Sequence, residues 1–290
     1  MKPNQFTYHP FFLTLWAMFG LFVLSSCNKK DDKPYKPQIV VDARIEEGGF
    51  PYVFLSQSTQ YESVIDSSSY FQIVLTKAKI TVWTDDECEI LILFRDTNYF
   101  PMHFYRGNSL KGKAGKTYHL QIIVDGDTLT SETTIPHKVM LDTFRMVTDE
   151  SDRKKGLIWV GFSDPVNEAN YYRAFTRIFR KQYQYQATHL SVVDDKSFNG
   201  KYIEFPLYQG NLTNTEKKTD FRFFKSDTID VKFCTMDKAS YDFWSSYERE
   251  VVNSGNPFGA EGQNLRSNIS GGIGVWSGYG VYKFRINGVK

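Results

Sequence analysis

The stretch TYHLQIIVDGDTLTSETTI, residues 117–135, holds the pattern that decides the fold of this chain. Polar and apolar residues alternate through most of residues 117–124, and threonine-rich sequence returns from Thr128 to Ile135. Asp125-Gly126, between them, favours a two-residue hairpin turn. Alternation with a period of two and many β-branched residues is typical of strands that bury one face. We therefore predict an antiparallel β-hairpin here.

Segments of the same kind recur along the chain with turn residues between them, which is typical of an all-β protein. Before the hairpin they cover residues 39–45, 52–55, 78–83, 89–94 and 99–105. After it a second set begins near Leu141 and includes residues 157–162, 170–185, 201–207, 220–224, 228–233 and 272–286. Pro136-His137 separates the two sets. We predict two immunoglobulin- or fibronectin-like β-sandwich domains, residues 38–137 and 138–290.

One helix is predicted in the second domain, over residues 237–254. Asp237 is a good N-terminal cap. Aromatic and apolar residues follow at helical spacing, and Gly255 is a typical stop. The residues with this spacing are Tyr241, Trp244, Tyr247 and Val251.

The N-terminus has the features of an export signal. A short apolar run from Phe11 to Leu24 fits a signal peptide and falls short of the ~20 residues that span a bilayer. Leu24-Ser25-Ser26-Cys27 then resembles a bacterial lipobox. We predict a signal peptide over residues 1–26, acylation of Cys27 with chains such as palmitate, and a polar tether over residues 27–37. An ordinary signal peptide or a single anchor helix is the alternative.

Lys30, Asp31 and Asp32 follow the lipobox. A Lys before two acidic residues resembles the export signal of Bacteroidota surface lipoproteins. A solvated tether would show the same charges, so both interpretations stay open.

The composition excludes some classes of function. The formal net charge is +2, which argues against a nucleic-acid binder. Aromatic residues make up 16% of the chain, and these suit the surfaces of β-sheets. With Cys27 acylated, only Cys88 and Cys234 remain. An oxidising compartment would permit a bridge between them, but two buried free thiols are favoured.

The sequence shows no catalytic or metal-binding pattern. The histidines His103, His119, His137 and His189 have no partners at ligand spacing. The acidic runs 85–87 and 194–195 could supply a carboxylate pair for glycoside hydrolysis, but turns favour Asp for local hydrogen bonds. Asp125-Gly126-Asp127 lacks the rest of a calcium loop. We expect no catalytic residue, no metal and no cofactor.

Several segments together resemble a Bacteroidota lipoprotein family known as domain of unknown function 4249. They are residues 39–45 with 52–55, Ala114-Gly115-Lys116-Thr117-Tyr118, Asp164-Pro165 with Asn170-Tyr171-Tyr172-Arg173, and SNISGGIGVW at residues 267–276. The resemblance implies a two-part β protein on the cell surface, often encoded beside TonB-dependent outer-membrane receptors. The family has no established catalytic residues to transfer.

A glycine-rich run, SGGIGVWSGYG at residues 270–280, has two interpretations. The favoured one is a structural corner in which Trp276 and Tyr279 pack against the helix around Trp244. The other is a surface for a ligand or partner, extended by a loop with aromatic residues. The possible partner surface then contains Asn256, Pro257, Phe258, Trp276 and Tyr279.

These expectations together favour a non-enzymatic lipoprotein on the surface of the outer membrane, where a lipid anchor would concentrate it beside a β-barrel. It would act as an accessory or ligand-capturing subunit of a TonB-dependent receptor complex. A structural or assembly factor of the envelope that binds only proteins is the alternative. An enzyme acting on surface glycans or peptides has the least support.

Overall fold

The computed structural model describes residues 36–59, 70–166, 168–210, 220–253 and 265–288. Pro37–Lys290 form one compact unit. The predicted signal peptide, Cys27 and the charges at residues 30–32 lie outside the described residues. No helix within the described part is long and apolar enough to cross a membrane.

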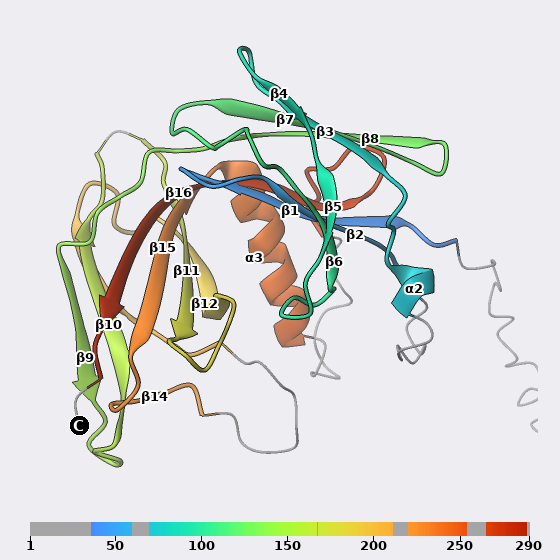
Figure 1. The fold of residues 1–290 in the computed structure, drawn as a ribbon. Coiled ribbons are helices and arrows are strands. Elements are labelled where there is room, and N and C mark those ends of the chain that lie inside the picture. The colour runs from blue at the N-terminus through green and yellow to red at the C-terminus, as the bar shows by residue number, and fades with distance from the viewer. Residues whose placement is uncertain (1–35, 60–69, 167, 211–219, 254–264, 289–290) are drawn as a thin grey trace, which may run out of the picture. The chain divides into compact units, whose positions relative to one another are not determined.

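An eight-stranded sheet forms the centre of the fold (Figure 1). Its strands are, in spatial order, β12 (Gln186–Asp194), β11 (Tyr171–Ile178), β15 (Ile229–Met236), β16 (Ile273–Ile286), β1 (Ile39–Glu46), β2 (Tyr52–Gln57), β6 (His103–Arg106) and β5 (Ile92–Arg95). The first and last parts of the chain meet here, because β1 pairs in parallel with β16. This pairing joins four strands from each predicted half of the chain in one sheet.

Two smaller sheets pack on this central sheet. One has the order β4 (Cys88–Ile90), β3 (Lys79–Trp83), β7 (Thr117–Val124) and β8 (Asp127–Thr134). The other contains β13 (Tyr202–Leu207), β10 (Lys155–Ser163) and β14 (Phe223–Phe224), with β9 (Thr143–Thr148) paired to β10. The helices are α2 (Tyr70–Ile73) and α3 (Lys238–Asn253).

Each small sheet closes a hydrophobic core against the same face of β16. Trp276 belongs to the core beneath β3 and β7, and its Nε1 donates a 2.9 Å hydrogen bond to the Tyr118 carbonyl oxygen. Tyr282, Phe284 and Ile286, further along the strand, pack on the core beneath β10. Even-numbered residues of a strand share one face, so one long strand serves both sandwiches.

Two glycines of β16 permit the segment after β8 to cross over this strand between the two sandwiches. A Cβ at Gly278 would meet the Thr134 carbonyl oxygen at 2.9 Å, and one at Gly280 would meet that of Pro136 at 2.3 Å. The segment after β8 therefore crosses directly over β16 where no side chain fits. The predicted boundary between residues 137 and 138 lies in this crossing segment, while the central sheet runs through both sides.

The all-β class, the sandwich-like arrangement and the helix near the C-terminus are confirmed. The hairpin at 117–135 is also confirmed, with Asp125 and Gly126 at positive φ in the turn. Asp237 caps α3, since its Oδ1 accepts a 2.8 Å hydrogen bond from the Ser240 backbone N–H.

The single strand predicted over residues 170–185 is wrong. β11 ends at Ile178, and Arg180 takes a positive φ of 64° in the turn that follows. The chain then returns as β12, which the sequence pattern did not predict.

Candidate functional site

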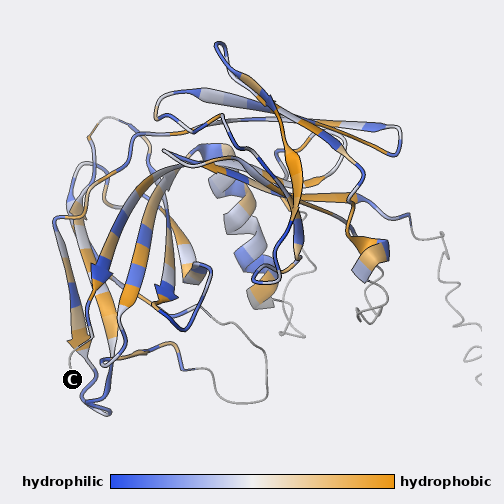
Figure 2. Ribbon diagram, viewed as in Figure 1, coloured by the Kyte–Doolittle hydropathy of each residue, from blue (hydrophilic) through white to orange (hydrophobic). Residues whose placement is uncertain are grey.

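The face of the central sheet opposite the two cores carries charged side chains. In β1, Val41, Ala43 and Ile45 are buried in the core, so Asp42, Arg44 and Glu46 project from the other face. Hydrophilic and apolar residues also alternate along β15 and β16 in Figure 2. Ordinary strand periodicity therefore produces a polar face across the middle of the molecule.

Neighbouring strands extend this polar face in register. Arg173, Phe175 and Arg177 of β11 lie opposite Cys234, Lys232 and Asp230 of β15. In turn, Lys232 lies opposite Lys283 of β16. Every residue of β15 is buried, including Asp230 and Lys232. Charged residues in a fully buried strand are costly unless they are paired or serve a site.

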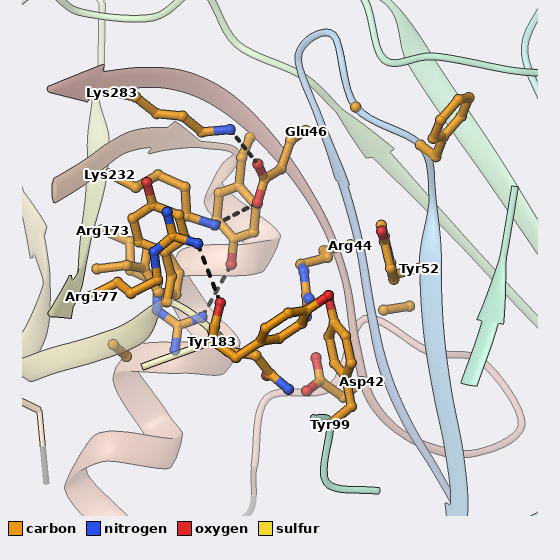
Figure 3. A pocket seen from close by; sticks show the side chains of 18 of the residues that line it. Asp42, Arg44, Glu46, Tyr52, Tyr99, Arg173, Arg177, Tyr183, Lys232 and Lys283 are labelled. Atoms are coloured by element: carbon orange, nitrogen blue, oxygen red, sulfur yellow. Dashed lines mark hydrogen bonds and ion pairs between the residues drawn. The ribbon is translucent and has the colours of Figure 1, made fainter. Parts of the chain in front are cut away.

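A pocket of about 640 Å³ lies on this face, between α3 and the strands (Figure 3). A volume of this order suits a small organic ligand. Its charged and polar lining residues are Asp42, Arg44, Glu46, Arg173, Arg177, Gln184, Lys232 and Lys283. Its aromatic lining residues are Phe50, Tyr52, Tyr99, Phe175, Tyr183, Tyr185, Trp244 and Tyr279. Ala43, Gly49 and Ala187 complete the lining.

Glu46 neutralises part of the positive charge. Its carboxylate lies 2.5 Å from Lys232 Nζ and 3.5 Å from Lys283 Nζ, and both ammonium groups point toward it in Figure 3. Burial alone would raise the pKa of Glu46, but the attraction of Lys232, Arg44 and Lys283 outweighs burial and brings the pKa to about 2. Glu46 is therefore ionised at neutral pH and holds the two lysines on the pocket floor.

Arg177 is paired in the same manner. Its Nη2 lies 2.7 Å from Asp230 Oδ2, and Arg285 shares that carboxylate. Burial tends to raise the pKa of Asp230, and the two guanidinium groups lower it overall. Two carboxylates thus serve four cations in this part of the sheet.

Arg173 is buried, and no carboxylate of the described residues forms an ion pair with it. Only 6% of its surface is exposed. Its Nε donates to Ser191 Oγ at 3.2 Å and its Nη1 donates to the Tyr279 hydroxyl at 3.1 Å. The guanidinium carbon lies 3.4 Å from the centre of the Trp244 ring, a cation–π contact. Glu248 reaches Arg173 only through Ser191, whose hydroxyl donates to it.

Two loops meet across the pocket. Tyr99, between β5 and β6, and Tyr183, between β11 and β12, contact edge to face with ring centres 5.9 Å apart. Beside them, Gln184 Nε2 donates a 2.6 Å hydrogen bond to the Asn98 carbonyl oxygen. A second, smaller cavity of about 170 Å³ lies next to the pocket. The two share Asp42, Arg44 and Gln184 as lining residues. Arg44 therefore faces both spaces.

The comparison with family models gives one match, to the domain of unknown function DUF4249, over residues 28–285. The chain belongs to the DUF4249 family. A comparison with curated proteins gives no match. The family resemblance found in the sequence is thus confirmed.

The glycine-rich run of this DUF4249 protein requires a correction. Trp276 is fully buried in a core, on the face of β16 away from α3, so it belongs neither to a contact surface nor to the packing around Trp244. Tyr279 is also buried, but it packs with Trp244 and lines the pocket. Asn256, Pro257 and Phe258 lie outside the described residues.

The other candidate residues of this DUF4249 protein have structural partners. Asp86 and Glu87 form exposed ion pairs with Lys116 and Lys113, and Asp194 pairs with Lys196. Asp195 Oδ2 accepts a hydrogen bond from the Asn170 backbone N–H. Each of these four acids therefore pairs with a nearby group of the fold.

No metal-type cluster of His, Cys, Asp and Glu occurs among the described residues. The two described cysteines are free thiols. Cys88 is exposed, which corrects the expectation that both thiols are buried, whereas Cys234 is buried beside the pocket floor.

Sequence reasoning missed the pocket of this DUF4249 protein because its residues come from distant segments. A signal was nevertheless present in IDVKFCTM at residues 229–236, where the charged residues Asp230 and Lys232 interrupt a largely apolar strand. A second signal was the alternation of aromatic residues and arginines at residues 171–178.

Proposed function

We propose that this protein is a non-enzymatic, lipid-anchored ligand-capturing subunit of a TonB-dependent receptor complex at the outer membrane. The anchor is Cys27, and the ligand site is the pocket on the central sheet. A tethered domain searches a small volume, so its effective concentration beside a β-barrel is high. The observation that carries the proposal is the 640 Å³ pocket, which lies on the face of the central sheet opposite the cores that contain Trp276 and Phe162.

The energetic cost of burying charged side chains at the pocket supports a binding role. Arg173 and Lys232 are 6% and 5% exposed, and burying such charges stabilises a fold less than apolar residues of similar size would. Both parts of the chain contribute lining residues, from β1 and β2 to β15 and β16. The site therefore exists only in the complete fold, as expected of a feature that serves function.

The anchor is tested by fractionation of cells. The Cys27→Ala protein should leave the membrane fraction, whereas the wild-type protein should remain in it. Retention of the variant after cleavage of residues 1–26 would contradict the anchor. Mass spectrometry of the mature N-terminus distinguishes a cleaved chain from an uncleaved one held by its apolar segment.

The capture role is tested by isolating the wild-type protein from cross-linked membranes. A β-barrel receptor should co-purify, and deletion of the gene should impair growth on one nutrient source only. A Tyr183→Ala variant, which opens the contact between the two loops, should reproduce that growth defect while still anchored. Normal growth of this variant on the same nutrient would contradict a role for the pocket.

An envelope assembly factor is the second candidate, and exposed apolar side chains favour it. Ile90 of β4 and Ile92 and Leu93 of β5 are 55%, 49% and 39% exposed. Exposed apolar side chains such as these are available for contacts with protein partners. A growth defect on every medium, together with an unaffected Tyr183→Ala variant, would favour this role.

A further inference from the structure

Two guanidinium groups in the pocket form no ion pair with a carboxylate of the described residues, although one of them, that of Arg44, attracts Glu46 from a greater distance. Within the described residues, no carboxylate oxygen lies within 4.0 Å of Arg44 or Arg173. The other three cations of the lining, Arg177, Lys232 and Lys283, are all paired. The lining holds five cationic side chains and the carboxylates of Asp42 and Glu46, and Asp230 outside the lining pairs with Arg177, so an excess of positive charge remains in a partly enclosed space.

Aromatic rings hold these two arginines. The guanidinium carbon of Arg44 lies 5.3 Å from the centre of the Tyr52 ring and 5.5 Å from that of Phe54. Arg173 is fixed by Trp244 and by its hydrogen bonds to Ser191 and Tyr279. The two groups are therefore oriented before a ligand arrives, which lowers the entropic cost of binding. A planar guanidinium fork matches the oxygens of carboxylate, sulfate or phosphate.

The position of the pocket limits what can occupy it. It lies on a face of the central sheet, where the backbone N–H and C=O groups of β1, β11, β15 and β16 already pair with neighbouring strands. An extended peptide adds to the open edge of a sheet and not to its face. Recognition here must come from side chains, which means from charges and from the aromatic walls around Tyr99, Tyr183 and Tyr185.

We propose that the pocket binds ring compounds that carry acidic oxygen groups, such as acidic sugars or aromatic acids. Arg173 and Arg44 bind the anionic groups, and the tyrosine rings pack on the faces of the ligand. Because Arg44 also faces the second cavity, a ligand of two or three rings occupies both spaces. This inference specifies the ligand class of the proposed capture function and rests on that function.

The test uses the mature protein in detergent and calorimetric titration. The probes are trigalacturonic acid, its neutral methyl ester, benzene-1,3,5-tricarboxylate and citrate, which has the charge but no ring. One of the two ring acids should bind at least tenfold more tightly than both the methyl ester and citrate. The acid that binds more tightly shows whether the ligand is an acidic sugar or an aromatic acid. Its affinity should fall as salt is added, because ions screen the attraction.

Variants then assign the binding to the two arginines. Arg44→Gln should weaken binding of the ring acid at least tenfold, and Arg173→Gln should do the same if its thermal unfolding shows a folded protein. Arg153→Gln is the matched control, because it removes one exposed positive charge in the turn between β9 and β10. Its affinity should stay within twofold of wild type.

Three results would overturn the inference: no binding of either ring acid, equal binding of acid and ester, or an unchanged affinity in Arg44→Gln. None of them bears on capture itself, since co-purification with a barrel and the growth phenotype of Tyr183→Ala test that separately. If no barrel co-purifies and Tyr183→Ala grows normally, but the acid still binds, the receptor role is contradicted. The proposed ligand class is then unaffected.

Discussion

Lys232 Nζ and Glu46 Oε1 lie 2.5 Å apart across the floor of the pocket, although 186 residues separate them in the sequence. Their side chains are 7% and 18% exposed. The pair joins β15 to β1 on the polar face, while β16 runs between those strands. It is a contact between the first and last parts of the chain, and it depends on the parallel pairing of β1 with β16.

Removal of the Glu46 charge should destabilise the protein. In Glu46→Gln the buried Lys232 loses its charged partner, and breaking a buried pair in this manner costs about 3–5 kcal/mol. Urea unfolding at pH 7 measures the loss. Glu132→Gln is the control, because the Glu132 side chain is 73% exposed and its loss should cost under about 1 kcal/mol. Equal stability of the two variants would show that the pair contributes little.

The same pair should make stability depend on acid pH. The pKa of Glu46 is about 2 in the folded chain, against 4.5 ordinarily. The unfolded state binds this proton more readily, so the stabilisation is complete above pH 4.5 and declines as the pH falls toward 2. A shift of this size corresponds to about 3 kcal/mol. Wild type and Glu46→Gln should therefore converge in stability near pH 2, and a constant difference from pH 7 to pH 2 would contradict this.

Local chemistry allowed much of the fold to be predicted from sequence. The Asp125-Gly126 turn and the cap at Asp237 act within a few residues, and both occur where the sequence places them. The predicted strand at 170–185 failed because aromatic residues continue through the turn after Ile178, at Phe179, Tyr183 and Tyr185. The turn places Arg180 at a positive φ. Arginine is not a residue type that predicts a positive φ, so the sequence contains no sign of the break.

Strand parity could have corrected one part of the site prediction. Trp276 and Tyr279 are three positions apart, so in a regular strand their side chains project from opposite faces. Only Tyr279 can then meet Trp244. The pocket itself could not be predicted in this way, because it depends on which strands become neighbours. The parallel pairing of β1 with β16, which brings Arg44 near Arg173 in one pocket, has no local sequence signal.

Gly274 should tolerate no side chain. It has a φ of 137°, and a Cβ there would meet the Val41 carbonyl oxygen at 1.9 Å, in the strand that pairs with it. Gly274→Ala must therefore separate β1 from β16 locally, and we expect a loss of at least ~3 kcal/mol or failure to fold.

Gly126→Ala is the matched control for this prediction. Gly126 also has a positive φ, of 89°, but a Cβ there would have nothing within 4 Å. The backbone strain alone should cost about 1–2 kcal/mol. Urea unfolding of both variants separates the steric clash from the strain. Similar losses would mean that β1 and β16 can move apart cheaply, and the pocket would then be less rigid than its contacts indicate.

Thiol counting should test both the fold and the anchor. Cys88 is exposed and should react with a thiol reagent in the native mature protein. Burial raises the pKa of Cys234 to about 12, so its unreactive thiol form prevails and the reagent cannot reach it. Acylation removes the thiol of Cys27 from the count. The expected result is one reactive thiol before unfolding and two after it. Two in the native protein and two after unfolding would contradict the burial of Cys234, whereas three after unfolding would show that Cys27 carries no thioether-linked lipid.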